Sequence, residues 1–358
     1  MKKRLLSLLV VFTLVFSITA CGQTKPNSNT DNSPEINTEI NTDINTEETS
    51  AAITQYPITV TDQAGREVTI ESEPQKLVSG YYISTSLLIA LDLDENLVGV
   101  ESNAQKRTIY KLCAPKLNDL PSVGTVKEID LEGCVALEPD LVILPLKLKH
   151  TAESFDSLNI DVFYVNPESQ DLLKEMISII GTATNTQEKA NTLINFITKQ
   201  ENLLTTTLAN ADAPSVYLAG NSNMLSTASS AMYQSSMIEL AGGKNVAADI
   251  IDTYWVEISY EQLLTWNPEY IILASDASYT IEDVLTDPNL AECSAIKNGN
   301  VYQIPYKVEA WDSPVPSGIL GSVWLATILH DDLFSDAEAS AIIDEYYETF
   351  YNFTYSEK

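Results

Sequence analysis

The sequence predicts an α/β protein with two lobes, each built on a central parallel sheet, joined by one long helix. Short apolar strands alternate with helical segments up to about residue 168, and the same alternation restarts after Pro214. Between these regions, residues 169–210 contain no strand pattern. Short apolar strands separated by helices are typical of a parallel sheet that is covered on both faces. The 358 residues are enough for two lobes of ordinary size.

The first lobe is expected to begin with a hairpin. Residues 58–62 and 67–70 alternate apolar and polar side chains, and Gly65 between them suits a tight turn. Apolar runs then predict four strands, at residues 76–79, 96–100, 140–144 and 161–165. Helices are expected between these strands, at residues 84–91 and at about 130–137.

The segment after the first lobe predicts two helices. Apolar residues recur at helical spacing from Leu172 to Ile180, and Gly181 is expected to break this helix. A second helix is expected to start at Thr186 as N-cap and to run to about Ala209. It would span roughly 35 Å, which is longer than a crossover within a small sheet needs. We therefore interpret it as the element that links the lobes.

The second lobe repeats the strand and helix pattern. Strands are expected at residues 215–219, 270–274 and 300–304. Helices are expected at residues 317–329 and 337–350, and residues 236–241 are expected to end another helix at Gly242 and Gly243. The predicted organisation is an N-terminal lobe at 56–184, a linking helix at 185–210 and a C-terminal lobe at 211–358.

The N-terminus has the pattern of an export signal. Three basic residues precede an apolar run at 5–17, and small residues lead to Cys21. The run is too short to span a membrane, which takes roughly 20 apolar residues. Cys21 resembles the lipidated cysteine of a bacterial lipobox, although a chance cysteine after an ordinary signal (residues 1–20) is the alternative. Residues 21–55 then read as a disordered tether. We expect an extracytoplasmic protein anchored by lipid to the cell membrane, on the outer face of a Gram-positive cell.

Composition narrows the possible partners. The formal net charge is −30 and the only arginines are Arg4, Arg66 and Arg107, which argues against binding to nucleic acid. Besides Cys21 there are Cys113, Cys134 and Cys293. Either one pair and a free thiol or three buried thiols are possible. No CxxC spacing for a structural zinc site occurs.

A ligand site is expected where the strands end. Open parallel sheets bind ligands beyond the carboxyl ends of their strands, and two lobes place a cleft there. The residues after the predicted strands are rich in Tyr, Trp, Ser and Asn, which suits a bulky and partly apolar ligand. The candidate ligand-binding residues are Tyr81, Tyr82, Arg107, Thr125, Lys147, Asn221, Ser222, Tyr233, Tyr254, Trp255, Trp311 and Asp312.

Trp255 and Trp311 are the strongest of these candidates, because polar residues and prolines around them favour loops over core helices. Any single aromatic residue could instead cover its lobe, and Asp312 could be a turn residue. No GxSxG, P-loop, HExxH or post-strand GxGxxG motif occurs, so we expect no enzyme. A surface hydrolase, or a sensor that uses the same fold without transport, is the competing class.

Five segments carry a family resemblance. Residues 58–70, 131–143, 258–272, 295–302 and 324–329 resemble, in order, motifs of ABC-transporter solute-binding proteins of the iron-siderophore and vitamin B12 group. This class III resemblance implies two Rossmann-like lobes on a rigid linking helix, with the binding domain at about 76–337. It also implies delivery of a ligand to an ABC permease and its ATPase, with no cofactor of its own, and we expect a monomer.

The resemblance further implies that Glu132 and Glu261, one in each lobe, dock on the permease. Each could equally be an exposed carboxylate that is favourable in the first turn of a helix. For the ligand we rank a ferric chelate first, a corrinoid or haem next, and molybdate or tungstate last. Two histidines are too few to resemble zinc or manganese binders. Only Arg107, Lys147 and Lys307 could serve an anionic catecholate.

Overall fold

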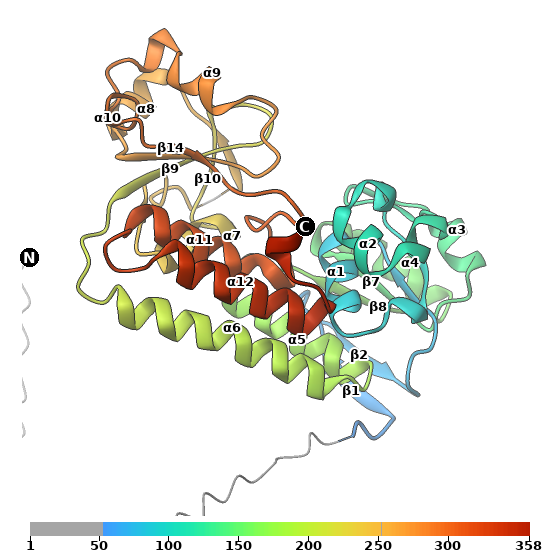
Figure 1. Cartoon of the computed structure of the whole chain (residues 1–358). Helices are drawn as coiled ribbons and strands as arrows, with labels where there is room; N and C mark the ends of the chain where they lie inside the picture. The colour runs from blue at the N-terminus through green and yellow to red at the C-terminus, as the bar shows by residue number, and fades with distance from the viewer. Residues whose placement is uncertain (1–52, 252) are drawn as a thin grey trace, which may run out of the picture. The chain divides into compact units, whose positions relative to one another are not determined.

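The computed structural model describes residues 53–251 and 253–358, which belong to one compact unit. Two four-stranded parallel sheets form its framework, as predicted (Figure 1). The export signal, Cys21 and nearly all of the tether lie outside the described residues. Among the described helices, none has the length and apolarity needed to cross a bilayer.

The first sheet has the strand order β4-β3-β7-β8. Its strands are β3 (Leu77–Ser79), β4 (Leu97–Val100), β7 (Leu141–Pro145) and β8 (Asp161–Val165). The hairpin before it pairs β1 (Ile58–Thr61) with β2 (Glu67–Ile70), and Gly65 has the positive φ of 75° that the turn requires. These elements confirm the predicted strands to within about a residue.

The second sheet has the strand order β11-β9-β13-β14. Its strands are β11 (Lys244–Asn245), β9 (Ser215–Ala219), β13 (Tyr270–Leu273) and β14 (Val301–Gln303). The short edge strand β11 was not predicted. Two residues are too few to show the alternation by which a strand is identified.

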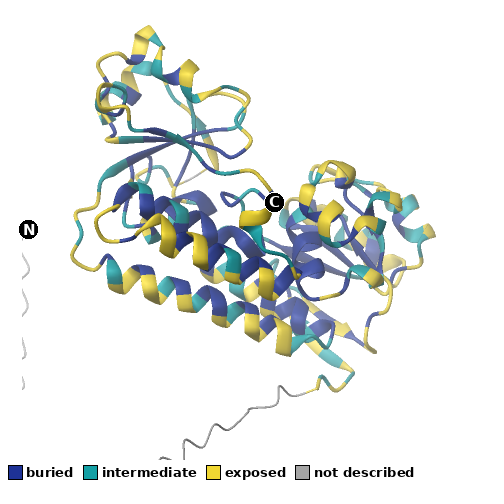
Figure 2. Cartoon of the chain, in the orientation of Figure 1, coloured by how far each residue is buried: buried dark blue, intermediate teal, exposed yellow. Residues whose placement is uncertain are grey.

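Each sheet is covered on both faces. In β7, Leu141 and Ile143 pack into one cluster of apolar residues, whereas Val142 and Leu144 pack into another. The same alternation occurs in β9 of the second sheet, where Val216 and Tyr217 pack into different clusters. Val216 belongs to the same cluster as Leu141 and Ile143 of the first sheet. One apolar core therefore runs through both lobes, and the buried residues of Figure 2 follow it.

Two consecutive helices connect the sheets, α5 (Gln170–Ala183) and α6 (Gln187–Thr207). The second confirms the predicted long helix, with Thr186 as N-cap and a length of roughly 31 Å. The predicted break at Gly181 is wrong, because this residue lies inside α5. Its missing side chain allows close approach to α6, where a Cβ atom would clash with Ala190. The chain turns later, at Asn185, with φ of 57°.

The other helices cover the sheets (Figure 1). In the first lobe they are α1 (Tyr82–Ala90), α2 (Thr108–Cys113), α3 (Leu131–Ala136) and α4 (Ala152–Ser157). In the second lobe they are α7 (Tyr233–Leu240), α8 (Tyr260–Trp266), α9 (Ile281–Leu285), α10 (Ser294–Asn298), α11 (Ile319–Leu329) and α12 (Asp336–Tyr351). Helix α7 ends at Leu240, just before Gly242 and Gly243, as predicted.

Two small antiparallel ladders complete the fold. One pairs β5 (Gly124–Thr125) with β6 (Glu128–Ile129). The other pairs β10 (Ser226–Ala228) with β12 (Trp255–Glu257), so Trp255 lies in a short strand and not in a loop, as its sequence neighbours had indicated. The three cysteines within the described residues are all free thiols, with Cys134 and Cys293 buried and Cys113 half-buried.

Candidate functional site

A cavity of about 580 Å³ lies beyond the carboxyl ends of β3, β7 and β8, where second-lobe residues face the first lobe. Both lobes contribute to its wall. The lining residues are Tyr81, Tyr82, Val126, Pro145, Leu146, Lys147, Val165, Asn166, Glu168, Met232, Tyr254 and Trp255. The position agrees with the general rule for ligand sites in open parallel sheets. Most of the lining is apolar or aromatic.

Aromatic side chains give this cavity its shape. The rings of Tyr81 and Tyr82 meet edge to face, with their centroids 5.4 Å apart. The hydroxyl of Tyr82 donates a hydrogen bond to Ser313 Oγ at 3.0 Å, which ties the first lobe to the second. Burial raises the pKa of Tyr82 to about 12, so this hydroxyl stays protonated. On the opposite lobe, Trp255 packs against Gly220, where a Cβ atom would come within 2.9 Å of the indole ring.

Arg107 does not line this cavity. Its Nε donates to Glu101 Oε1 at 3.0 Å, and its guanidinium carbon lies 4.1 Å from the centroid of the Tyr82 ring. Glu101 also accepts hydrogen bonds from Tyr110 at 2.9 Å and from Thr85 at 2.7 Å. The charge of Arg107 is thus compensated inside the first lobe. Its side chain borders a separate, smaller cavity that Tyr82 shares.

The structure brings together five of the predicted ligand residues in the cavity wall: Tyr81, Tyr82, Lys147, Tyr254 and Trp255. Thr125 is exposed in β5, next to the lining residue Val126. Asn221 and Ser222 lie in the loop after β9 and do not line the cavity. The amide of Asn221 instead donates to the carboxylate of Asp276.

Three further candidates are buried away from the cavity. Trp311 is 1% exposed, and its indole N–H donates to Tyr347 Oη at 3.0 Å. The Tyr233 hydroxyl accepts a hydrogen bond from Gln170 Nε2 at 2.7 Å. Asp312 accepts hydrogen bonds from the backbone N–H and the hydroxyl of Ser275, at 3.0 and 2.6 Å. All three side chains are buried and none lines the cavity, so their positions do not support a ligand role. The polar residues next to Trp311 and Asp312 in the sequence did not indicate this burial.

Glu168 is a lining residue that the sequence reasoning missed. It follows β8 directly, together with Asn166. The rule that identified the other loops applies to this strand as well, because its carboxyl end lies at the same edge of the sheet. The signal that could have identified Glu168 is therefore its place in the loop after residue 165, at the end of a parallel strand.

Glu132 and Glu261 are both exposed, and both occupy the first turn of a short helix. Their helices are capped in the same way: Asp130 accepts a hydrogen bond from Gly133 N at 2.9 Å, and Ser259 accepts one from Gln262 N at 3.1 Å. The two carboxylates therefore occupy the same position in their helices, one helix in each lobe. The positions suit the helix dipole and leave both side chains accessible to a partner.

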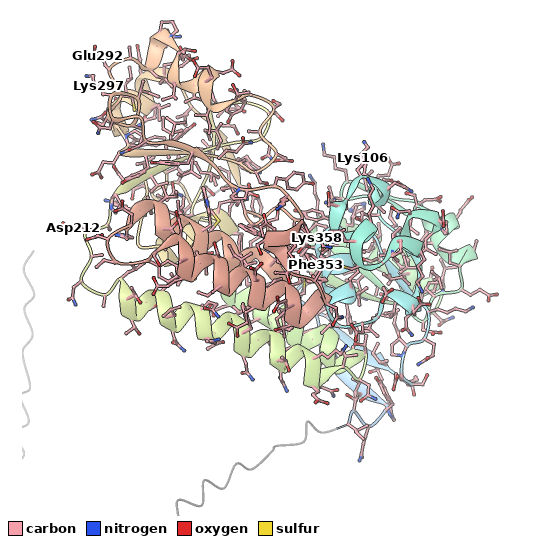
Figure 3. The ribbon with its side chains drawn as sticks, in the orientation of Figure 1. Lys106, Asp212, Glu292, Lys297, Phe353 and Lys358 are labelled. Carbon is pink, nitrogen blue, oxygen red and sulfur yellow. The ribbon has the colours of Figure 1, made fainter. Side chains whose placement is uncertain are left out.

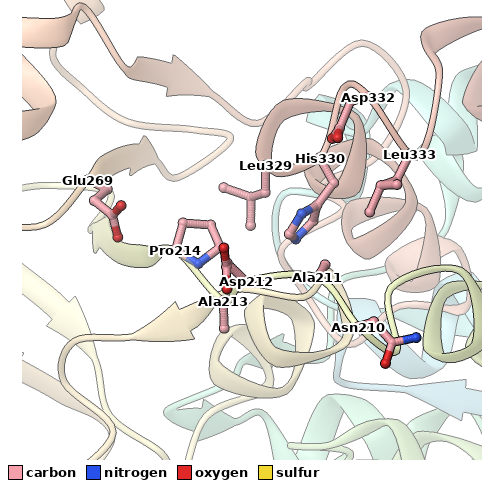
Figure 4. A pocket seen from close by; sticks show the side chains of 10 residues that line it. All are labelled: Asn210, Ala211, Asp212, Ala213, Pro214, Glu269, Leu329, His330, Asp332 and Leu333. Atoms are coloured by element: carbon pink, nitrogen blue, oxygen red, sulfur yellow. The ribbon is translucent and has the colours of Figure 1, made fainter.

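A second hollow, of about 470 Å³, lies at the amino ends of β9 and β13, where Pro214 and Glu269 precede the two strands (Figure 4). His330 lines it, with Nε2 lying 3.3 Å from the carbonyl oxygen of Gly242. This hollow lies at the amino ends of strands, whereas the cavity lined by Tyr81, Tyr82, Tyr254 and Trp255, here called the aromatic cavity, lies at the carboxyl ends of strands. Only the second lobe and the segment just before β9 line the hollow. The aromatic cavity is therefore the better candidate for the ligand site.

This chain is similar in sequence and in structure to known binding proteins. A family model described as periplasmic binding protein matches residues 77–308. The molybdate-binding protein MolA of Haemophilus influenzae is 28% identical over 323 residues, covering 83% of this chain and 91% of MolA. The structure of MolA bound to molybdate superposes with a TM-score of 0.74 at 26% identity, covering 83% of this chain and 99% of that one.

Two other relatives carry different descriptions. YvrC of Bacillus subtilis, described as an uncharacterized ABC transporter substrate-binding lipoprotein, is 25% identical, covering 78% of this chain and 88% of YvrC. A vitamin B12-binding protein of Yersinia pestis is 25% identical, covering 57% of this chain and 71% of that protein. MolA and the vitamin B12-binding protein thus carry the names of different ligands.

Proposed function

This chain belongs to the periplasmic binding protein family, and we propose that it captures a bulky metal chelate in the cavity between Tyr81 and Trp255. As a substrate-binding protein of an ABC importer, it works with a permease and its ATPase. Within the proposed class, an iron complex of the siderophore type ranks first, and a corrinoid or haem is the alternative. The protein would bind and release its ligand without acting as an enzyme.

The cavity is the observation that carries this proposal. Its volume of about 580 Å³ lies within the range of roughly 300–1,000 Å³ that is usual for sites of organic ligands. Four aromatic side chains and several aliphatic ones line it. Such a wall gains free energy by covering the organic framework of a chelate. It offers few hydrogen-bond donors to a small ion.

Molybdate or tungstate is the second candidate ligand, favoured by the likeness to MolA. An oxyanion of five atoms occupies the volume of only a few water molecules, at about 30 Å³ each. Lys147 is the one cationic side chain that lines the described cavity, and the carboxyl group of Glu168 lines it too. Because Arg107 is already paired with Glu101, we rank the oxyanion below the chelate.

Anchoring by a lipid on Cys21 is part of the proposal. The YvrC relative is described as a lipoprotein, which agrees with the lipobox pattern. Tethering would keep the receptor near its permease and raise its effective concentration there. A sensor on the same scaffold would not need to stay close to a permease. A permease gene and an ATPase gene beside this one would favour the importer.

A thermal-shift panel tests the ligand class. A ferric trihydroxamate chelate, haem, cobalamin and molybdate are added separately to the purified chain. A ligand at 100 times its Kd stabilises the folded state by about 2.7 kcal/mol, which raises Tm by roughly 5 °C for a chain of this size. We expect such a shift from a chelate and none from molybdate. A shift from molybdate alone would make the oxyanion the ligand.

The substitution Trp255→Ala should raise the Kd tenfold or more for whichever chelate shifts Tm in this panel. Trp255 is 38% exposed at the cavity wall, so truncation removes ligand contact more than core packing. The matched control is Tyr306→Ala, an aromatic residue that is 50% exposed and does not line this cavity. Calorimetric titration of both variants measures the difference. Equal affinities in the two variants would place the ligand elsewhere.

A further inference from the structure

Glu168 is the one carboxylate among the described residues that line the aromatic cavity. One of its oxygens, Oε2, accepts a hydrogen bond from the backbone N–H of Tyr233 at 3.3 Å. This contact fixes the side chain between β8 and the start of α7. Within the described part of the chain, no hydrogen bond reaches the other oxygen, Oε1. That oxygen is available to a group inside the cavity.

The charge of Glu168 has no counterion among the described residues. Burial raises its pKa, and only the N–H of Tyr233 opposes that shift. Arg107 is held by Glu101, and Lys147 forms no ion pair in the described structure although it lines the same cavity. Glu168 is half-buried, so its carboxylate keeps part of its contact with water, and a cation in the cavity would compensate for the contact with water that burial removes.

The aromatic rings around Glu168 favour the same kind of partner. Burial is the main cause that raises the pKa values of Tyr81 and Tyr82, and the negative charge of Glu168 adds a smaller contribution in the same direction. Tyr254 and Trp255 complete the aromatic wall from the second lobe. Ring faces attract cations, and a carboxylate beside them adds a charge-assisted hydrogen bond. Rings and carboxylate together form a site for an ammonium group.

We propose that Glu168 is a specificity-determining residue of the cavity, which accepts a hydrogen bond from an alkylammonium group carried by the metal chelate. The inference rests on the proposed function, since it names which chelates are preferred. It selects neutral or cationic complexes over strongly anionic ones. A polyanionic catecholate complex would meet Glu168 with like charge, and Lys147 is the one cationic side chain of the described cavity wall that could offset it, because Arg107 is paired with Glu101.

Two matched probes test this role. One is a linear ferric trihydroxamate chelate that ends in a free ammonium group, and the other is the same chelate with that amine acetylated. Calorimetric titration at pH 7 gives their affinities for the full chain, for Glu168→Gln, and for Glu153→Gln. Glu153 is an exposed carboxylate on α4 and serves as the control. A single cooperative thermal transition in each variant confirms that both are folded.

The wild-type chain should bind the ammonium chelate about tenfold more tightly than the acetylated one, the usual contribution of a charged hydrogen bond. Glu168→Gln should remove that preference and Glu153→Gln should keep it. Equal binding of both probes by the wild type, or a preference that survives in Glu168→Gln, would overturn the role of Glu168 while chelate binding itself stands. Failure of both probes to bind would overturn the proposed function as well.

Discussion

Replacing Trp311 with Ala is expected to lower the free energy of unfolding by about 3–5 kcal/mol, the usual cost of truncating a buried aromatic side chain. Trp311 is 1% exposed, and its ring lies against Tyr355 with the centroids 5.2 Å apart. The change also removes the indole donor that bonds Tyr347 Oη. Urea unfolding followed by circular dichroism measures the loss.

The same variant separates a core role from a ligand role. The C-terminal residues that follow α12 include Phe353 and Lys358 (Figure 3). The ring of Phe353 stacks on Tyr347, the residue that accepts the hydrogen bond of the Trp311 indole. Tyr306→Ala, at an exposed position a few residues earlier, should change stability by no more than about 0.5 kcal/mol. If Trp311→Ala left stability unchanged and abolished ligand binding, the sequence-based ligand role would be correct and the position in the core would not explain this residue.

Removing both Glu132 and Glu261 is expected to reduce uptake of the ligand by tenfold or more while its affinity stays unchanged. Neither residue lines the aromatic cavity, and both are exposed at the same position of a capped helix, one in each lobe. Truncating one partner of a charge pair at an interface typically costs about 2–5 kcal/mol. Transport of a radioactive iron chelate into cells, with calorimetry on the purified double variant, measures the two effects.

The chain offers a matched control for this double substitution. Glu153 and Glu282 are also exposed carboxylates in the first turns of helices, α4 in the first lobe and α9 in the second. Replacing both with Ala removes the same charge from the same kind of site. Uptake should remain near the wild-type level in this control. Normal uptake in the Glu132 and Glu261 double variant would refute the docking role.

The sheets and the long helix could be predicted because their patterns extend over many residues. In β7 and β9, unbroken apolar runs identify strands that are buried on both faces. In α6, apolar side chains repeat over 21 residues. Short elements such as β11 and β12 depend on partners that are distant in sequence, so local patterns did not reveal them. Gly181 shows the same limit, since its role lies in the approach of α6 and not in its own helix.

The candidate site was predictable where it depends on strand ends and not where it depends on packing. Tyr81 and Lys147 follow β3 and β7, and the rule for parallel sheets was enough to find them. Trp311 could not be assigned from its neighbours, because the residues that bury it, Tyr347 and Tyr355, come from the end of the chain. Arg107 lies outside the wall of the aromatic cavity for a related reason, since its guanidinium pairs with Glu101 inside the first lobe.

The most direct test of the central claim is a crystal structure of the chain with a ferric trihydroxamate chelate, using the anomalous signal of iron to locate the metal. The account predicts one strong iron peak inside the cavity bounded by Tyr81, Lys147 and Trp255. A cavity that stays empty of chelate while molybdate occupies it, or an iron peak found only on the outer surface of a lobe, would contradict the account.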